Sequence, residues 1–488
     1  MHISSLPGAY GIGALGKEAH AFVDFLAKAG QTYWQTLPVC PAGEGNSPYS
    51  SFSTFAGNPY FIDLDTLCEE GLLFSEELQR ERRELDESQV DYDWLHANRR
   101  ELLFAAYQRF KRKNQDDYEA FCEEHIDWLD EYALYMAIKE ASGDAPWMEW
   151  ETKYKFREPD AMDAFRHENT ETVHFWKTVQ YFFFQQWSEL KCYANTQGVR
   201  IIGDLPIYVA MDSADVWSKP EEFLLDENLY PASVSGCPPD AFSITGQLWG
   251  NPLYRWDLMK QQQYEWWVRR FYHLKELFDV TRIDHFRGFD SYYAIPADHK
   301  DAKKGDWRPG PGLDLFRVAE EKLGKMNIIA EDLGFLTASV RKLVLDSGFP
   351  GMKVLQFAFD SRESNDYLPH NYPAHCVVYT GTHDNDTTLG WLKMARPDDV
   401  DYAVEYLRLN QQEGYHWGMI KSVWASVADT SIVPMQDLLG LGNEARMNTP
   451  STEEGNWRWR MKPGAADDAL AEKMLHLMEV YHRIPHDE

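Results

Sequence analysis

Three carboxylic acids each follow a short apolar run that is rich in β-branched residues. They are Asp284, Glu331 and Asp384, and the segments that contain them are Thr281–Gly288, Ile328–Gly334 and Tyr379–Asp386. Acidic residues in this position are typical of catalytic groups at the carboxyl ends of barrel strands. Because cleavage of a glycosidic bond requires two carboxyl groups and passes through an oxocarbenium-like transition state, the three acids predict chemistry on sugars.

Asp284 has the sequence context of a nucleophile. Residues two apart on a strand face the same way, so Arg282 and Asp284 are expected to project together. The guanidinium would keep the carboxylate ionised, as attack on an anomeric carbon requires. A buried ion pair that only closes the barrel is the alternative. His285 and Arg287 make this strand end polar, which favours catalysis.

Glu331 is predicted to be the general acid/base. The apolar residues Ile328–Ala330 precede it. Apolar neighbours with little water raise the pKa of a carboxyl group, so the proton stays available for the leaving oxygen. The adjacent Asp332 points to the opposite face and would cap the next helix or pair with an arginine. Helix capping is also the alternative role for Glu331.

Asp384 is predicted to stabilise the transition state. In Thr382–Asp386, clustered donors and acceptors can bind the hydroxyls of a distorted sugar ring and stabilise positive charge. The sequence does not say whether Asp384 or Asp386 points inward. A divalent metal held by His383, Asp384 and Asp386 is the competing interpretation. The segment lacks a second histidine at i+4 on a helix and any fixed ligand spacing, so we predict no metal.

Several polar and aromatic residues lie on segments that could contact a sugar. Ser47 and Tyr49 follow the second expected strand, Asp204 ends the third, and Trp249 lies on a long loop rich in glycine and proline. A tryptophan or tyrosine on such a loop can fold over a bound ring and exclude water. Ordinary loop packing or turn formation is the alternative for each of them.

The strands that must position these residues alternate with helical segments. Glu18–Ala29 has apolar residues at helical spacing before Gly30, and Val173–Leu190 is a second apolar helix. Eight strands are expected, at His2–Ser4, Tyr33–Leu37, Val199–Asp204, Phe278–Asp284, Asn327–Glu331, Met352–Phe357, Cys376–Thr380 and Ser431–Met435. This alternation predicts an α/β fold, a (β/α)8 TIM barrel with large helical and loop insertions at the carboxyl face.

Two stretches interrupt the alternation. Residues 64–172 are rich in Glu, Asp and Arg at helical spacing and predict a helical insertion subdomain, so that residues 1–63 and 173–488 make the catalytic barrel. A loop-rich excursion at about residues 211–256 would lie over the cleft. Loops of that length are usually functional.

Composition argues against several partners. The chain has 78 acidic and 48 basic residues, and its formal net charge of −30 repels nucleic acid and anionic membrane surfaces. No window approaches the ~20 apolar residues of a transmembrane helix, and residues 1–30 do not resemble a signal peptide.

The six scattered cysteines predict reduced thiols in the cytoplasm. No phosphate loop or dinucleotide fingerprint is present, so no cofactor is expected, while the oligomeric state stays open.

Taken together, these segments resemble the 4-α-glucanotransferases called amylomaltases or disproportionating enzymes, of glycoside hydrolase family seventy-seven. The resemblance lies in His2–Gly8, Asn46–Ser51, Gly203–Val209, Gly246–Pro252, Arg282–Gly288, Ala330–Gly334, Gly381–Asn385 and Asn456–Arg460. It implies α-1,4-glucan and maltooligosaccharide donors and acceptors. It also implies a retaining double displacement that moves a glucan segment to the 4-hydroxyl of glucose or another glucan.

The resemblance implies roles for individual residues. Asp284, Glu331 and Asp384 occupy the nucleophile, acid/base and stabiliser positions of the family. The residues expected near the donor subsite are Arg282, His285 and His383; those near the cleavage point are Ser47 and Tyr49; those on a loop that overhangs the cleft are Asp240, Gln247 and Trp249.

Three features depart from the family pattern. The chain begins at Met1, so the expected first strand is short. Ser451 follows Pro450 where the family often has glycine, which would supply backbone freedom. Ala241 stands where some relatives carry tyrosine, which would remove one aromatic contact on the acceptor side.

Two other functions remain open at this point. Either water or a sugar can capture a glycosyl intermediate, so a retaining α-glucan hydrolase is one alternative. A non-catalytic glucan-binding barrel, whose carboxylates only bind hydroxyls, is the other. We expect transfer to dominate, because Trp249 and Phe242 on the overhanging loop would shield the acceptor site from water.

Overall fold

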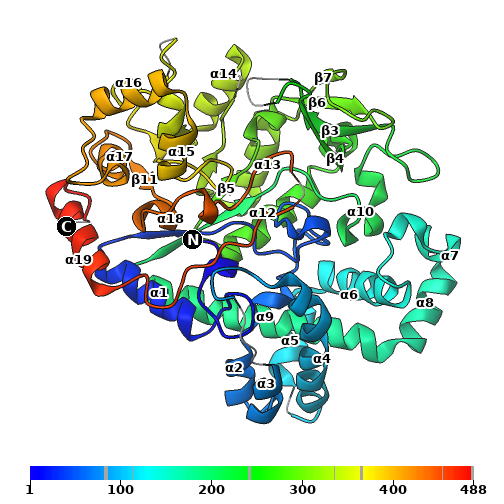
Figure 1. The fold of residues 1–488 in the computed structure, drawn as a ribbon. Coiled ribbons are helices and arrows are strands. Elements are labelled where there is room, and N and C mark those ends of the chain that lie inside the picture. The colour runs from blue at the N-terminus through cyan, green and yellow to red at the C-terminus, as the bar shows by residue number, and fades with distance from the viewer. Residues whose placement is uncertain are drawn as a thin grey trace.

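Seven parallel strands form the central sheet of the molecule (Figure 1). The computed structural model describes residues 1–81, 86–113, 115–239, 243–334, 336–362, 366–452 and 454–484. In spatial order the strands are β1 (Tyr33–Gln35), β2 (Arg200–Leu205), β5 (Val280–Ile283), β8 (Ile328–Ala330), β9 (Gly351–Val354), β10 (Cys376–Tyr379) and β11 (Thr430–Ile432). Each matches a strand expected from the sequence. The sheet curves into a nearly closed barrel, so the predicted TIM-barrel fold is confirmed.

The predicted strand at His2–Ser4 is wrong. Ile3–Ser5 forms a 3-10 turn, in which Leu6 donates its N–H to the carbonyl of Ile3 (3.1 Å). Only Met1 and His2 run beside β1, where the Met1 amino group donates to the carbonyl of Gln35 (3.1 Å). Because the extended backbone ends at His2, the described residues 1–6 add no strand to the sheet.

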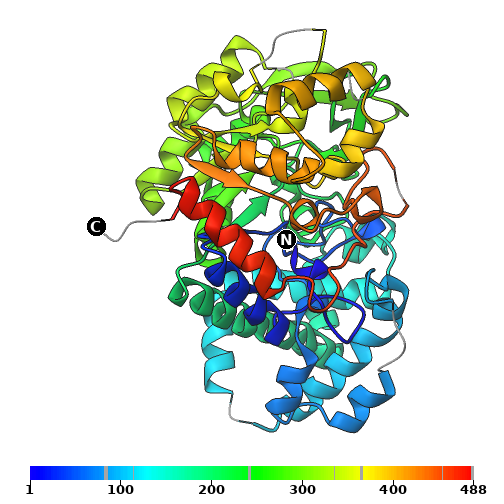
Figure 2. The ribbon, with the colours of Figure 1, turned by 60° about the vertical axis from the view of Figure 1, so that its left-hand side comes forward.

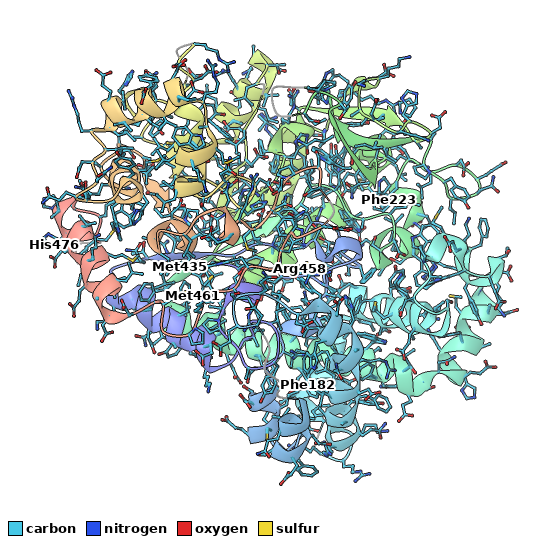
Figure 3. The ribbon with its side chains drawn as sticks, viewed as in Figure 1. Phe182, Phe223, Met435, Arg458, Met461 and His476 are labelled. Atoms are coloured by element: carbon cyan, nitrogen blue, oxygen red, sulfur yellow. The ribbon has the colours of Figure 1, made fainter. Side chains whose placement is uncertain are left out.

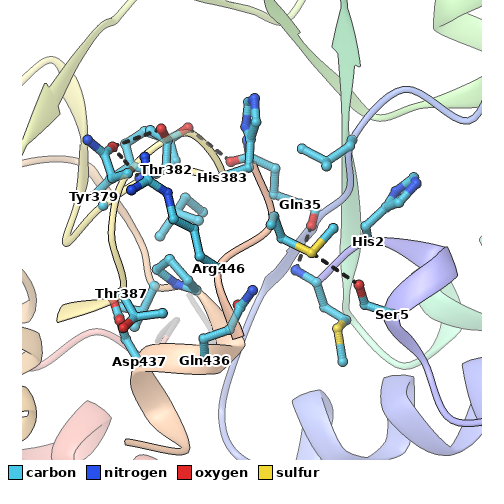
Figure 4. A pocket seen from close by; sticks show the side chains of 18 of the residues that line it. His2, Ser5, Gln35, Tyr379, Thr382, His383, Thr387, Gln436, Asp437 and Arg446 are labelled. Atoms are coloured by element: carbon cyan, nitrogen blue, oxygen red, sulfur yellow. Dashed lines mark hydrogen bonds between the residues drawn. The ribbon is translucent and has the colours of Figure 1, made fainter. Parts of the chain in front are cut away.

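A cavity of about 90 Å³ lies beside this N-terminal segment (Figure 4). Its lining comes from His2, from Gln35 of β1, from Tyr379 of β10 and from Ile432 of β11. The Tyr379 hydroxyl donates to the side-chain oxygen of Gln35 (2.9 Å). The cavity thus lies where the sheet stays open, and His383 connects it to the carboxyl ends of the strands.

Helices surround the sheet (Figures 1 and 2). Outside the stretch at residues 64–172, the described α-helices are α1 (Lys17–Lys28), α9 (Thr170–Thr196), α10 (Ala214–Ser218), α11 (Trp256–Gln261), α12 (Glu265–Leu277), α13 (Leu313–Leu323), α14 (Ala338–Ser347), α15 (Thr388–Met394), α16 (Pro397–Leu407), α17 (Tyr415–Trp424), α18 (Met435–Leu438) and α19 (Asp468–Val480). The two helices predicted from spacing are α1 and α9. The C-terminal α19 lies against α1, as Figure 2 shows. Among the described residues, no helix is both long and apolar enough to span a bilayer.

The stretch at residues 64–172 is helical. It contains α2 (Leu64–Glu69), α3 (Ser75–Glu81), α4 (Tyr92–Phe110), α5 (Asp116–Glu124), α6 (Ile126–Ala141), α7 (Thr152–Lys155) and α8 (Pro159–Glu168). Of these helices, α4, α5, α6 and α8 pack on the long α9, where Phe182, labelled in Figure 3, meets the ring of Phe110 edge-on at 5.3 Å. That this stretch is a separate subdomain stays a prediction.

A second, antiparallel sheet was not expected from the sequence. Its order is β4 (Gln247–Pro252), β3 (Ser233–Cys237), β6 (Ser291–Pro296) and β7 (Asp306–Pro309). β3 and β4 fall in the excursion that the sequence indicated as loop, because Gly, Ser and Pro dominate there. At Gly236 a Cβ would lie 2.3 Å from the carbonyl oxygen of Gln247, so the glycine permits the close pairing of β3 and β4.

Candidate active site

Adjacent strands of the barrel bring the candidate acids together at their carboxyl ends. The ladder pairs Asp204 with Arg282, and Ile283 with Ala330. Beyond it, Asp284 donates its N–H to the carbonyl of Leu205 (2.9 Å), and Glu331 donates its N–H to the carbonyl of Ile283 (3.0 Å). Asp284 and Glu331 therefore begin where neighbouring strands end, on the same rim of the barrel.

A buried guanidinium links two of the acids. The Arg282 side chain donates to both carboxylate oxygens of Asp204 (2.7 and 2.8 Å) and to Asp284 (3.0 Å). The Tyr49 hydroxyl donates to Asp204 as well (2.6 Å). The prediction that Arg282 and Asp284 project to the same side is thus confirmed. Burial raises the pKa of Asp284, and the Arg282 charge opposes this increase.

Glu331 is held by backbone groups alone in the described part of the chain. Its carboxyl oxygens accept the N–H of His285 (2.7 Å) and of Leu333 (2.8 Å). His285 has a left-handed backbone (φ +51°), which turns its N–H toward Glu331. Burial, followed by the charge of Asp284, raises the pKa of Glu331 to about 7. This agrees in direction with the increase predicted from its apolar neighbours.

Neither acid at this strand end caps a helix. The next helix, α14, is capped by the Thr337 hydroxyl, which accepts the N–H of Val340 (3.3 Å). Asp332 instead accepts the N–H of Met352 on β9 (2.7 Å). The capping alternatives for Glu331 and Asp332 are therefore wrong.

The geometry distinguishes Asp384 from Asp386. Asp386 forms an ion pair with Arg446 and accepts a hydrogen bond from Asn443 (2.9 Å). Asp384 accepts a hydrogen bond from Asn448 (2.6 Å) and lies close enough to Asp284 for its charge to raise the pKa of that acid. Asp384 is thus the acid that faces the site. Among the described residues, no group of His, Cys, Asp and Glu is arranged to hold a metal ion.

Stacked rings form one wall of the site. The rings of Tyr49 and His383 are nearly parallel (17°) with centroids 5.1 Å apart, and Trp457 lies 5.8 Å from each of them. The Ser47 hydroxyl accepts the N–H of Tyr49 (3.2 Å) and so fixes the turn that carries this ring. The sequence did not single out Trp457 or Asn448. The tryptophan-rich segment Asn456–Arg460 was the available signal.

The loop before Trp457 contains a strained residue. Ser451 is exposed and has φ +64°, a conformation that glycine adopts without strain. The turn is nevertheless closed, since Thr452 donates its N–H to Thr449 (3.2 Å) and Thr449 donates its own to the side chain of Asn456 (2.9 Å). The loop therefore keeps its hydrogen bonds although Ser451 has a strained backbone.

The variant Ser451→Gly is expected to raise the free energy of unfolding by about 1 kcal/mol, because it removes left-handed strain. Chemical denaturation measures this change. Ser142→Gly is the matched control, because Ser142 has φ −93°. It should lower stability by about 0.5–1 kcal/mol through backbone entropy. Equal destabilisation by both variants would contradict the assignment of strain to Ser451.

Trp249 on β4 lies beside the residue that follows Asp284. Its ring meets His285 edge-on at 4.7 Å, and its indole N–H donates to the side chain of Gln247 (3.1 Å). Burial, followed by the charge of Arg287, lowers the pKa of His285 to about 3, so this ring stays neutral. Asp240, Ala241 and Phe242, predicted to lie on the same loop, fall outside the described residues.

Comparisons with known proteins identify the family of the chain. The family model described as 4-alpha-glucanotransferase matches residues 1–466. The 4-alpha-glucanotransferase of Clostridium butyricum is 49% identical, with 99% of this chain and 100% of the relative covered, and that of Thermus thermophilus is 46% identical, with 99% and 98% covered. The structure of amylomaltase from Streptococcus agalactiae in complex with acarbose superposes with a TM-score of 0.96 at 40% identity, covering 99% of this chain and 98% of that one. The chain therefore belongs to the 4-alpha-glucanotransferase family, glycoside hydrolase family 77.

Proposed function

We propose that Asp284 is the nucleophile, Glu331 the acid/base and Asp384 the transition-state stabiliser of a retaining 4-α-glucanotransferase. The observation that carries the assignment is the unequal environment of two acids on adjacent strand ends. Arg282 donates to Asp284, whereas backbone N–H groups hold Glu331. At neutral pH the charge of Arg282 favours negative charge on Asp284, whereas burial and the charge of Asp284 favour a proton on Glu331.

The first half-reaction uses both acids at once. Glu331 gives its proton to the glycosidic oxygen, the bond from that oxygen to the anomeric carbon breaks, and the Asp284 carboxylate bonds to this carbon. The leaving segment departs with a free 4-hydroxyl. Asp384, partly exposed and fixed by Asn448, is suited to accept hydroxyl hydrogen bonds and to stabilise the positive ring in the transition state.

The second half-reaction reverses the first. The 4-hydroxyl of an acceptor sugar gives its proton to Glu331 and attacks the anomeric carbon, which releases Asp284. Two inversions at one carbon retain the α configuration. Arg282 holds the carboxylate of Asp284 in place, Asp204 accepts hydrogen bonds from Arg282, and Tyr49 in turn donates to Asp204.

The proposed donors and acceptors are α-1,4-glucans and maltooligosaccharides. Sugar rings present apolar faces and hydroxyl edges, which match the rings of Tyr49, Trp457 and Trp249 beside the carboxylates. Glucans are uncharged, so the net charge of −30 does not oppose their binding.

The six cysteines are free thiols, which supports our proposal of a cytoplasmic enzyme.

Transfer is expected to dominate over hydrolysis. Incubation with maltotriose should give a ladder of shorter and longer glucans with little gain in reducing ends, which product chromatography and a reducing-sugar assay measure together. If reducing ends accumulate as fast as maltotriose disappears, the retaining hydrolase is the correct function.

The Trp249→Ala variant should raise the ratio of hydrolysis to transfer about tenfold, since the lost ring admits water beside His285. Tyr272→Ala, which removes a ring that is 52% exposed on α12, is the control and should leave the ratio unchanged. The same ratio in all three proteins would show that Trp249 does not exclude water.

A further inference from the structure

Trp307 on the edge strand β7 is an exposed aromatic residue with a fixed position. Its side chain is 44% exposed, although its ring has two fixed neighbours. The guanidinium of Arg287 lies 4.1 Å from the ring centroid, and the ring of Tyr293 on β6 is 5.2 Å away. A ring that is already held in place loses little conformational entropy when a ligand stacks on it.

Arg287 connects this ring to the acid/base. Arg287 lies in the 3-10 turn Phe286–Phe289, whose first residue donates its N–H to the carbonyl of Glu331 (3.0 Å). Burial lowers the pKa of Arg287, and the charge of Glu331 is among those that oppose this shift. Trp307 thus contacts Arg287, whose charge interacts with Glu331, the residue that we propose protonates the leaving oxygen.

The segment that follows Asp284 contacts rings on both edge strands of the antiparallel sheet. His285 meets Trp249 of β4, and Arg287 meets Trp307 of β7. Of the two residues, Arg287 is the one whose charge interacts with Glu331, so Trp307 is attached to the Glu331 side of this segment. Since the acid/base contacts the leaving oxygen, and later the acceptor hydroxyl, the leaving segment and the acceptor occupy this side of the cleavage point.

We propose that Trp307, held by Arg287, is a stacking platform for glucose units of the acceptor glucan beyond those bound in the catalytic pocket. The negative face of an indole attracts the C–H face of a sugar ring, and the buried guanidinium fixes the orientation of the indole. The platform selects long acceptors, because a single glucose in the pocket does not extend to Trp307. This inference rests on the proposed transferase function.

The test compares acceptors of two lengths. With α-maltosyl fluoride as a fixed donor, initial transfer rates are measured for the full chain against increasing glucose or maltohexaose. Trp307→Ala should raise KM for maltohexaose about fivefold to tenfold, the effect of one lost aromatic contact, and change KM for glucose less than twofold. Trp307→Phe should keep most of the affinity for maltohexaose.

Phe74→Ala is the matched control. Phe74 is 54% exposed and also lies under an arginine, with Arg109 at 4.2 Å from its ring, but it belongs to the α2–α3 region far from β7 (Figure 1). This variant should change neither KM. Trp307→Leu keeps an apolar contact with Arg287 but has no aromatic face, and it should reproduce the length-dependent loss if Trp307→Ala does not fold.

The outcomes separate the platform from the proposed function. If the KM for maltohexaose stays within twofold of the wild-type value in Trp307→Ala and Trp307→Leu, Trp307 is not an acceptor platform. Equal losses with glucose and maltohexaose also overturn the platform, because they indicate that Trp307 only supports the fold around Arg287. If the wild-type protein transfers to neither acceptor, it is the proposed transferase function that fails.

Discussion

Replacement of Asp284 by asparagine is expected to lower kcat/KM for maltotriose disproportionation by a factor on the order of 10⁴ or more. Asparagine has the same shape and still accepts a hydrogen bond from Arg282, but its amide does not attack the anomeric carbon. The loss should therefore appear mainly in kcat, without a change in the stability of the fold. Disproportionation rates and a denaturation curve, recorded for the same preparation, measure the two effects separately.

Asp386→Asn is the matched control for this experiment. Asp386 is also an aspartate paired with an arginine, Arg446, close to the same rim of the barrel. It should reduce activity far less than Asp284→Asn does, because it only supports the loop that carries Asp384. Covalent labelling gives a second measurement, since an activated 5-fluoro glycosyl donor should attach to Asp284 in the wild-type protein. If Asp284→Asn retains activity within about tenfold of wild type, Asp284 is not the nucleophile.

The barrel could be predicted from the sequence because several of its strands, such as β8 and β10, are buried on both faces. Such strands read as short apolar runs, for example Ile328–Ala330 and Cys376–Tyr379, and the helices between them have a clear spacing. The strand expected at His2–Ser4 is wrong, because it was assigned only to complete a set of eight. A strand requires a partner at its edge, and the backbone turns at Ile3 before such pairing can form.

The antiparallel sheet shows a different limit of sequence patterns. β3 and β4 are rich in Ser, Gly and Pro, so their local preference is for loops. Their strand structure comes from pairing with each other and from the pairing of β3 with β6, which contributes Tyr293–Pro296. Propensity is weak evidence where long-range pairing supplies the hydrogen bonds.

In the candidate site, too, local sequence patterns located some residues, whereas others depend on contacts with distant parts of the chain. Asp284, Glu331 and Arg282 were identified because strand periodicity and strand ends determine where their side chains point. The choice between Asp384 and Asp386 could not be made, because it depends on Arg446 and Asn448, which lie about 60 residues later in the chain. Contacts of this kind arise from tertiary packing and leave no local periodicity in the sequence.

The pH dependence of the first half-reaction should report the protonation of Glu331. Its pKa is raised to about 7 by burial and by the charge of Asp284, and the protonated form is the one that donates to the leaving oxygen. kcat/KM for maltotriose should therefore fall about tenfold for each pH unit above this pKa. At lower pH the rate should fall as Asp284 becomes protonated. Initial rates between pH 4 and pH 9, measured in buffers of constant ionic strength, test this profile.

Glu331→Gln should remove the decrease at high pH and lower kcat/KM for maltotriose by about 10²–10⁴-fold, the usual contribution of a positioned acid. A donor whose leaving group needs no proton, such as α-maltosyl fluoride, should still form the glycosyl intermediate on Asp284 at nearly the wild-type rate. Asp332→Asn is the control, because Asp332 is the adjacent acid but bonds to β9. It should keep the decrease at high pH, since Glu331 remains. If Glu331→Gln slows glycosylation by the fluoride as strongly as by maltotriose, Glu331 does not act by proton transfer.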